Sequence, residues 1–121
     1  MSSRVTIFHN PNCSTSKYAV GVAEEMGVEH ELVKYMLKSS HPTREQLTEL
    51  VEKLEDPTTD LVRRDANFTK LGITDADVET PEQVIDLLVQ YPQLLQRPIL
   101  VKGDRAIIGR PKDRVAPFLS S

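Results

Sequence analysis

The first 35 residues contain two short apolar segments separated by a helical pattern, and this arrangement limits the fold more than any other feature. The segment Arg4 to His9 (R-V-T-I-F-H) is short, β-branched and aromatic, which is typical of a strand. Glu29 to Tyr35 (E-H-E-L-V-K-Y) is a second expected strand. Between them, apolar residues recur at the spacing of one helix face, namely Ala19, Val22, Ala23 and Met26, and Gly27 is placed to end that helix. The pattern predicts a β-α-β unit, whose two strands are parallel if they share a sheet.

The middle of the chain, about residues 43–92, is predicted to be helical. Thr43 and Gln46 fit a capping box, and Thr80 with Pro81 and Gln83 is a second start signal. The apolar stripes that follow these two starts are Leu47, Leu50, Val51 and Leu54, then Val84, Ile85, Leu87 and Leu88. Shorter helical pieces are expected around Asp60–Arg63 and Phe68–Leu71, and Pro92 should end the last of the central helices.

The C-terminal segment predicts a hairpin and a final helix. Pro98 to Lys102 and Ala106 to Gly109 are apolar runs separated by Gly103-Asp104, which favours an antiparallel β-hairpin. Pro111 should then open a helix that ends near Phe118. The fold class is therefore α/β, with a thioredoxin-like mixed sheet (β-α-β, then β-β-α) and a helical insertion over about 43–92. A chain of 121 residues fits one domain, 1–121.

Charge and hydropathy exclude several classes of function. The formal net charge of −3 and the pI of about 5.6 provide no basic excess to displace counterions from phosphates, so no nucleic-acid partner is expected. No stretch approaches the ~18 apolar residues of a membrane span, and the N-terminal residues do not resemble a signal peptide. The small size and the lack of an obvious apolar surface stripe favour a monomer.

The chain has a single cysteine, Cys13, and this count bounds its redox chemistry. No intrachain disulfide can form, so a reduced, cytoplasmic protein is expected. The three histidines (His9, His30 and His41) are scattered along the chain, so no metal site is predicted.

Cys13 stands where the first strand gives way to the helix. The first turn of a helix has unpaired N–H groups that carry about half a positive charge, and they lower the pKa of a thiol placed there. Ser14, Thr15 and Ser16 add hydroxyl groups and further amides, which makes the turn a possible cradle for an oxyanion as well as for a thiolate. A lone cysteine is more often a small buried hydrophobe, but Cys13 lies in a polar, turn-forming segment and not on an apolar stripe. The position therefore predicts a nucleophile.

Two arginines stand at the ends of the predicted hairpin. Arg97 precedes Pro98 and Arg110 precedes Pro111. In a thioredoxin-like arrangement, the residue before the first hairpin strand packs beside the cysteine turn, and Pro98 is a candidate cis proline. An arginine fork can bind two oxygens of a tetrahedral oxyanion, although each arginine taken alone is more often a solvated surface residue.

These residues resemble those of the ArsC-type, glutaredoxin-coupled arsenate reductases. The matching segments are V-T-I-F-H-N-P-N-C-S-T-S (Val5–Ser16), L-V-R-R (Leu61–Arg64), K-L-G-I (Lys70–Ile73), L-L-Q-R-P-I-L-V (Leu94–Val101) and I-I-G-R-P (Ile107–Pro111). They occur in the expected order over nearly the whole chain. The resemblance implies that Cys13 is the nucleophile, that Arg97 and Arg110 bind the oxyanion, and that Arg63 is the third such arginine, with the adjacent Arg64 as the alternative.

The resemblance also implies supporting residues and a reaction. His9 matches the histidine of the family's H-N-P segment and is a candidate helper of the site. Ser14 stands where family members often have Gly, and Lys17 where they often have Arg. The implied reaction is attack of the Cys13 thiolate on arsenate to give a covalent intermediate. The implied reductant is an external thiol (glutathione or an equivalent) with glutaredoxin, and no bound cofactor is expected.

Other functions are compatible with parts of this pattern. A regulator of the Spx type, which resembles ArsC in fold and binds RNA polymerase, would use a C-x-x-C pair, whereas Ser16 stands at the second position here. A general glutaredoxin-like thiol transferase could use a single cysteine but would have no need of the arginines. A protein tyrosine phosphatase would want a C-x5-R loop, and Ala19 stands where that arginine would be.

Overall fold

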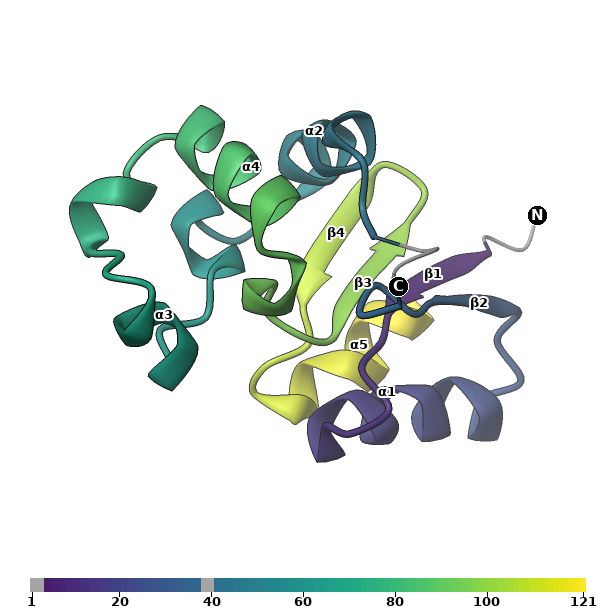
Figure 1. The fold of residues 1–121 in the computed structure, drawn as a ribbon. Coiled ribbons are helices and arrows are strands. Elements are labelled where there is room, and N and C mark those ends of the chain that lie inside the picture. Colours follow the sequence, from purple (N-terminus) through teal and green to yellow (C-terminus); the bar gives the residue numbers. More distant parts are fainter. Residues whose placement is uncertain (1–3, 38–40) are drawn as a thin grey trace.

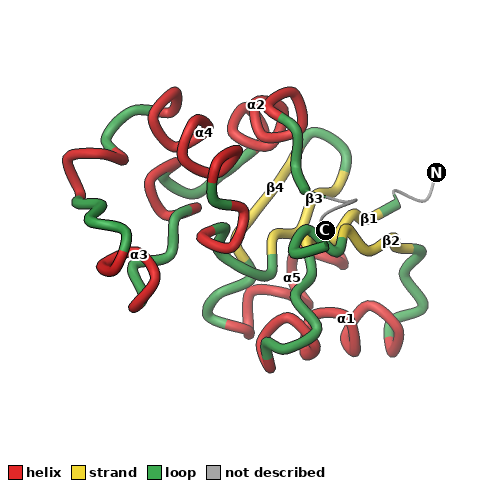
Figure 2. The backbone as a smooth tube through the Cα atoms, in the orientation of Figure 1, coloured by secondary structure: helices red, strands yellow, loops and turns green. Residues whose placement is uncertain are grey.

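The computed structural model describes residues 4–37 and 41–121, which form one mixed sheet with helices on both of its faces (Figures 1 and 2). The strands are β1 (Val5–Phe8), β2 (His30–Val33), β3 (Ile99–Lys102) and β4 (Arg105–Ile108), in the order β2-β1-β3-β4. β1 is parallel to β2 and antiparallel to β3, and β3 and β4 form the antiparallel hairpin. The expected thioredoxin-like class with β-α-β followed by β-β-α is confirmed.

Among the described residues, five α-helices connect and cover these strands, with short 3-10 turns between them. They are α1 (Ser14–Glu25), α2 (Arg44–Lys53), α3 (Ala66–Lys70), α4 (Pro81–Gln90) and α5 (Val115–Ser120). None of these helices in the described part of the chain is long and apolar enough to cross a membrane.

Alternation along β1 divides the interior into two layers. Val5 and Ile7 point to the face covered by α1 and α5, where they pack with Ala19, Ala23 and Phe118. Phe8 points to the opposite face, where the helical middle of the chain supplies the larger cluster. Figure 1 shows α1 and α5 together on one side of the sheet and α2 and α4 on the other. The end of β1 therefore emerges between the two layers.

The predicted helix signals act as their residues suggest. Thr43 with Gln46 and Thr80 with Gln83 form capping boxes at the starts of α2 and α4. Gly27 follows α1 with φ of +66°, a left-handed conformation that favours glycine. These starts and stops are local interactions, so they could be read from the sequence.

Several predicted boundaries were wrong. The two middle pieces begin two residues earlier than expected, at Thr58–Leu61 and Ala66–Lys70, and the Asp65 side chain caps α3 and fixes the start of the second piece. The last α-helix begins at Val115 and not at Pro111, since a 3-10 turn over Lys112–Arg114 intervenes. Met26 is exposed and not part of the buried face, because α1 ends at Glu25.

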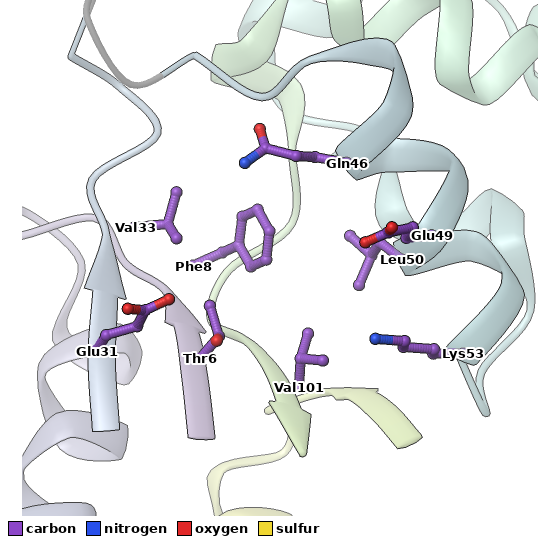
Figure 3. Close-up of a pocket in the computed structure, with 9 residues that line it drawn as sticks. All are labelled: Thr6, Phe8, Glu31, Val33, Gln46, Glu49, Leu50, Lys53 and Val101. Carbon is purple, nitrogen blue, oxygen red and sulfur yellow. The ribbon is translucent and has the colours of Figure 1, made fainter. Parts of the chain in front are cut away.

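One cavity of about 210 Å³ lies between α2 and the sheet, away from Cys13 (Figure 3). Its apolar wall is formed by Phe8, Val33, Leu50 and Val101. The charged residues at its edge are Glu31, Glu49 and Lys53, and the lining also includes Thr6 and Gln46. It contains none of the candidate site residues, so the site is found elsewhere.

Candidate active site

Cys13 is the N-cap residue of α1, at the point where the chain leaves β1. Its backbone is extended (φ −107°, ψ 122°), its N–H donates to the Asn10 carbonyl at 3.0 Å, and its carbonyl accepts from Lys17 N at 3.0 Å. The side chain is 8% exposed. The thiol therefore lies at the end of α1 whose backbone N–H groups have no partner within the helix. The predicted position of Cys13 at a helix start is confirmed.

Ser16 holds this turn together from inside. Its hydroxyl lies 2.7 Å from His9 Nδ1 and accepts from Asn10 N at 3.0 Å, and the residue is fully buried. The Asn10 side chain in turn accepts from Asn12 N at 2.9 Å. The sequence had suggested that the Ser16 hydroxyl adds to an oxyanion cradle. The structure instead commits that hydroxyl to the turn and leaves the Ser16 amide facing the thiol.

His9 lies behind the turn and is 7% exposed. Burial lowers its pKa, and the positive charges of Lys34 and Lys17 lower it further, against a smaller opposing effect of the hydrogen bond with Ser16. The imidazole is therefore neutral near pH 7. Its contact with Ser16 connects it to the shape of the turn and not to the thiol directly.

Arg110 and Arg97 reach the thiol from the hairpin. Arg110 Nη2 lies 3.3 Å from Cys13 Sγ, and Arg110 Nε donates to the Arg97 carbonyl at 2.7 Å. The Arg97-Pro98 peptide bond is cis, as the sequence suggested, and Arg110-Pro111 is also cis, which was not anticipated. One arginine thus contacts the thiol while it is held by the backbone of the other.

Arg63 is brought toward Arg97 by the pairing of two loop segments. Val62 forms an isolated antiparallel bridge with Leu95, Arg63 N donates to the Leu94 carbonyl at 2.8 Å, and Gln96 N donates to the Leu61 carbonyl at 2.6 Å. The segment that carries Arg63 therefore lies beside the residues that lead into Arg97. This pairing joins positions more than 30 residues apart, and nothing in the local sequence marks it.

Two arginine nitrogens in this region are buried without a partner among the described residues. They are Arg63 Nη1 and Arg97 Nε. A buried donor without an acceptor costs about 1–3 kcal/mol, and more when the group is charged. A small oxyanion placed between these groups and the thiol would supply the acceptors.

Arg64 is engaged elsewhere. Its guanidinium donates to the Thr59 carbonyl and hydroxyl, to the Val62 carbonyl and to Asp75, and it lies 5.7 Å from the centre of the Phe68 ring. These contacts hold together the loop between the 3-10 turn and α3. The geometry therefore favours Arg63 over Arg64 as the third arginine near the thiol.

Tyr35 is a site neighbour that the sequence did not reveal. It is fully buried, and its hydroxyl donates to the Leu95 carbonyl at 3.4 Å. Burial raises the pKa of this phenol, while Arg97, Asn10 and Arg63 act in the opposite direction from close by. The hydroxyl thus lies among the arginines. Tyr35 was visible only as the last residue of a predicted strand, and it lies two residues beyond β2.

The environment of Cys13 favours the thiolate. Burial raises the pKa of the thiol, but this is outweighed by hydrogen bonds from the Ser16 amide, Arg97 and the Thr15 amide and by the charge of Arg110, so the net pKa is below the ordinary value. The causes are the helix-start amides and two arginines from the hairpin.

We expect Cys13 to react with iodoacetamide at lower pH than a free cysteine. Only the thiolate reacts, so the rate should rise with pH, and its midpoint should lie below that of a free thiol, which is about 8.5. Replacing Arg110 with Gln removes one of the charges that lower the pKa of Cys13, so the midpoint of the alkylation rate should move to higher pH. The alkylation rate followed by mass spectrometry from pH 4 to 10 measures both midpoints. A wild-type midpoint at or above that of free cysteine would contradict the assignment.

Position 109 requires glycine because its backbone lies too close to Pro98 to leave room for a side chain. A Cβ at this position would lie 2.8 Å from Pro98 Cγ, and Gly109 N donates to the Pro98 carbonyl at 2.8 Å. We expect Gly109→Ala to lower the free energy of unfolding by about 1–3 kcal/mol, because the added methyl group overpacks a buried contact. Urea unfolding measures this.

A matched control for Gly109 is available within α1. A Cβ at Gly21 meets nothing within 4 Å, so Gly21→Ala should raise the free energy of unfolding by up to about 1 kcal/mol through helix propensity alone. Equal effects of the two substitutions would contradict the packing argument.

The structure assembles no group of three or more His, Cys, Asp or Glu side chains that could hold a metal ion within residues 4–37 and 41–121. The expectation that the site works without a metal stays a prediction.

Comparison with known proteins places this arrangement in a family. The ArsC family model matches residues 8–118. An arsenate reductase of Escherichia coli is 30% identical over 97% of this chain and 82% of its own length, and the E. coli K12 protein YfgD is 33% identical over 95% of this chain and 96% of its own length. A solved structure named arsenate reductase from Vibrio cholerae superposes with a TM-score of 0.81 at 26% identity, covering 97% of this chain and 98% of that one. The chain belongs to the ArsC family.

Proposed function

We propose that this chain is an arsenate reductase in which Cys13 is the nucleophile. The observation that carries the proposal is the contact of Arg110 Nη2 with Cys13 Sγ at 3.3 Å, beside two buried arginine nitrogens that lack acceptors. This arrangement combines a stabilised thiolate with donors for a tetrahedral oxyanion. The names of the curated relatives support arsenate as that oxyanion.

The first step forms a covalent intermediate. The Cys13 thiolate attacks the arsenic of HAsO₄²⁻, a sulfur–arsenic bond forms, and one As–OH leaves as water after taking up one proton. The product is a Cys13–S–AsO₃²⁻ ester. This step brings negative charges together. They are stabilised by the side chains of Arg63, Arg97 and Arg110 and by the backbone amides of Ser14, Thr15 and Ser16.

The second step reduces the arsenic. An external thiolate attacks Cys13 Sγ, a disulfide bond forms, and the electron pair of the sulfur–arsenic bond stays on arsenic, which leaves as arsenite. The chain has one cysteine, so no second thiol of its own can do this. We propose glutathione or an equivalent as the reductant, with glutaredoxin resolving the mixed disulfide on Cys13.

The remaining residues have positioning roles in this scheme. His9 holds Ser16 and through it the turn that presents the amides to the thiol. The proposal also includes a cytoplasmic, monomeric protein of one domain, 1–121, because a free thiolate needs a reducing compartment and the site is assembled from one chain.

The test is arsenate-dependent oxidation of NADPH in a mixture of the protein, glutathione, glutathione reductase and glutaredoxin. Turnover that saturates with arsenate and needs every component is the expected result. Phosphate has the same shape and charge and should compete. Absence of turnover, together with no protection of Cys13 from alkylation by arsenate, would contradict the proposal.

A further inference from the structure

A second cavity, of about 390 Å³, borders the site at Arg110. Its lining comes from the loops before and after the hairpin and from the loop that contains Arg63, and consists of Asp56, Asp60, Val62, Arg64, Gln96, Ile108, Arg110 and Arg114. Only Arg110 is shared with the oxyanion site. The guanidinium that contacts Cys13 Sγ therefore forms part of the wall of a larger, polar cavity that the first reaction step does not use.

Several of the charges in this cavity are already engaged. Arg64 donates to Thr59, Val62 and Asp75. Asp56 accepts from Ile108 N at 2.9 Å and lies 3.0 Å from Arg114 Nη1. These bonds hold the walls of the cavity in place and use most of the hydrogen-bonding capacity of Arg64 and Asp56.

Two charged groups of opposite sign are left for a ligand. Both bonds that Arg114 makes with described residues, to Asp56 and to the Arg110 carbonyl, leave from Nη1, so its Nε–Nη2 edge has capacity for a carboxylate. Asp60 is exposed, and none of the bonds made by Arg64 or Arg114 goes to it. Gln96 also lines the cavity, and its side-chain oxygen accepts from Arg97 N at 3.3 Å.

We propose that this cavity binds the thiol reductant, and that it selects a thiol carrying both a carboxylate and an ammonium group, as glutathione does. Arg114 binds the carboxylate, Asp60 binds the ammonium group, and the thiol lies toward Arg110 and Cys13. This inference rests on the proposed function for its chemistry, in which an external thiol must reach Cys13 Sγ.

The size and position of the cavity agree with this occupant. Small-ligand sites commonly measure about 300–1,000 Å³, and this cavity of about 390 Å³ lies within that range for a tripeptide. The cavity beneath α2 is about 210 Å³ and is lined by no arginine of the site, whereas the 390 Å³ cavity is lined by Arg110. The positive charge of Arg110 would also stabilise the thiolate of the incoming reductant. This ionised form is the one that attacks Cys13 Sγ to make the disulfide.

The kinetic test compares two reductants on the variant Asp60→Asn. We expect KM for glutathione to rise about tenfold, which corresponds to 1.4 kcal/mol of binding free energy. KM for 2-mercaptoethanol, which has neither charge, and KM for arsenate should not change. Asp104→Asn is the matched control, because Asp104 is exposed in the turn between β3 and β4 and does not line the cavity. Equal effects of the two variants on glutathione would overturn the proposal.

A binding test separates this inference from the proposed function. S-methylglutathione, which cannot react, is titrated into the full-length Cys13→Ser protein and followed by NMR, with and without Asp60→Asn. Shifts at Asp60, Gln96 and Arg114 that weaken in Asp60→Asn support the site even if arsenate is not reduced. Arsenate turnover with no binding of S-methylglutathione, or with shifts centred elsewhere, would overturn the site and leave the proposed function standing.

Discussion

Replacing Cys13 with serine should abolish arsenate reduction and leave the fold intact. We expect kcat to fall by a factor on the order of 10³ or more, because a serine hydroxyl is not ionised near pH 7 and cannot form a disulfide with the external thiol. Serine is a good N-cap residue, so α1 should begin at the same place. NADPH oxidation in the coupled system measures the rate, and circular dichroism with thermal unfolding verifies the fold.

The covalent step can be verified on the wild-type protein under the same conditions. With arsenate and glutathione but no glutaredoxin, the mixed disulfide of Cys13 with glutathione should accumulate, and mass spectrometry should find it at this residue alone, as it is the one cysteine of the chain. Arsenate reduction by Cys13→Ser at the wild-type rate would end the proposal of a covalent mechanism at this residue.

Arg63→Gln and Arg64→Gln should affect different properties of the protein, although the two residues are adjacent. Arg63 has a buried Nη1 without a described partner, so Arg63→Gln should reduce kcat/KM for arsenate by about 10²–10³-fold with little change in stability. Arg64 makes several loop contacts, so Arg64→Gln should lower the free energy of unfolding by about 1–3 kcal/mol and leave kcat/KM nearly unchanged. Steady-state kinetics and urea unfolding of both variants make the comparison.

Variants of the three arginines assigned to the site test the alternative thiol-transferase function. If Arg63→Gln, Arg97→Ala and Arg110→Ala all keep full activity on a glutathione mixed disulfide, and the wild-type protein lacks arsenate turnover, the arginines do not serve an oxyanion and a general thiol transferase is favoured. Loss of arsenate affinity in Arg64→Gln but not in Arg63→Gln would exchange the two assignments.

The candidate site was predictable to the extent that its parts are local. A cysteine in a polar turn between a strand and a helix has its amide environment determined by its immediate neighbours, so the helix-start position of Cys13 followed from the sequence. The arginines at the ends of the hairpin were placed by their adjacent prolines and by the order of the elements. The choice between Arg63 and Arg64 could not be made locally, because it depends on the bridge between Val62 and Leu95.

The roles of two buried polar side chains, Ser16 and Tyr35, were also beyond the sequence. The Ser16 hydroxyl was interpreted as part of an anion cradle, yet it lies against His9 and Asn10 because the turn folds inward. Tyr35 resembled a strand end, and only packing against Leu95 brings its hydroxyl among the arginines. The start of α3 was missed because the capping by Asp65 competes with a weak apolar pattern.

By itself the sequence determined the β-α-β start, the capping boxes, the hairpin and the position of the single cysteine at a helix start, because each depends on interactions between residues close together in the chain. Tertiary structure decided which arginines meet the thiol, which hydroxyl groups are committed to the turn, and that Arg110 borders a second cavity. The contact of Arg110 with Cys13 and the bridge between Val62 and Leu95 join positions about 30 to 100 residues apart, and their geometry is fixed only when the sheet and the helical middle pack together.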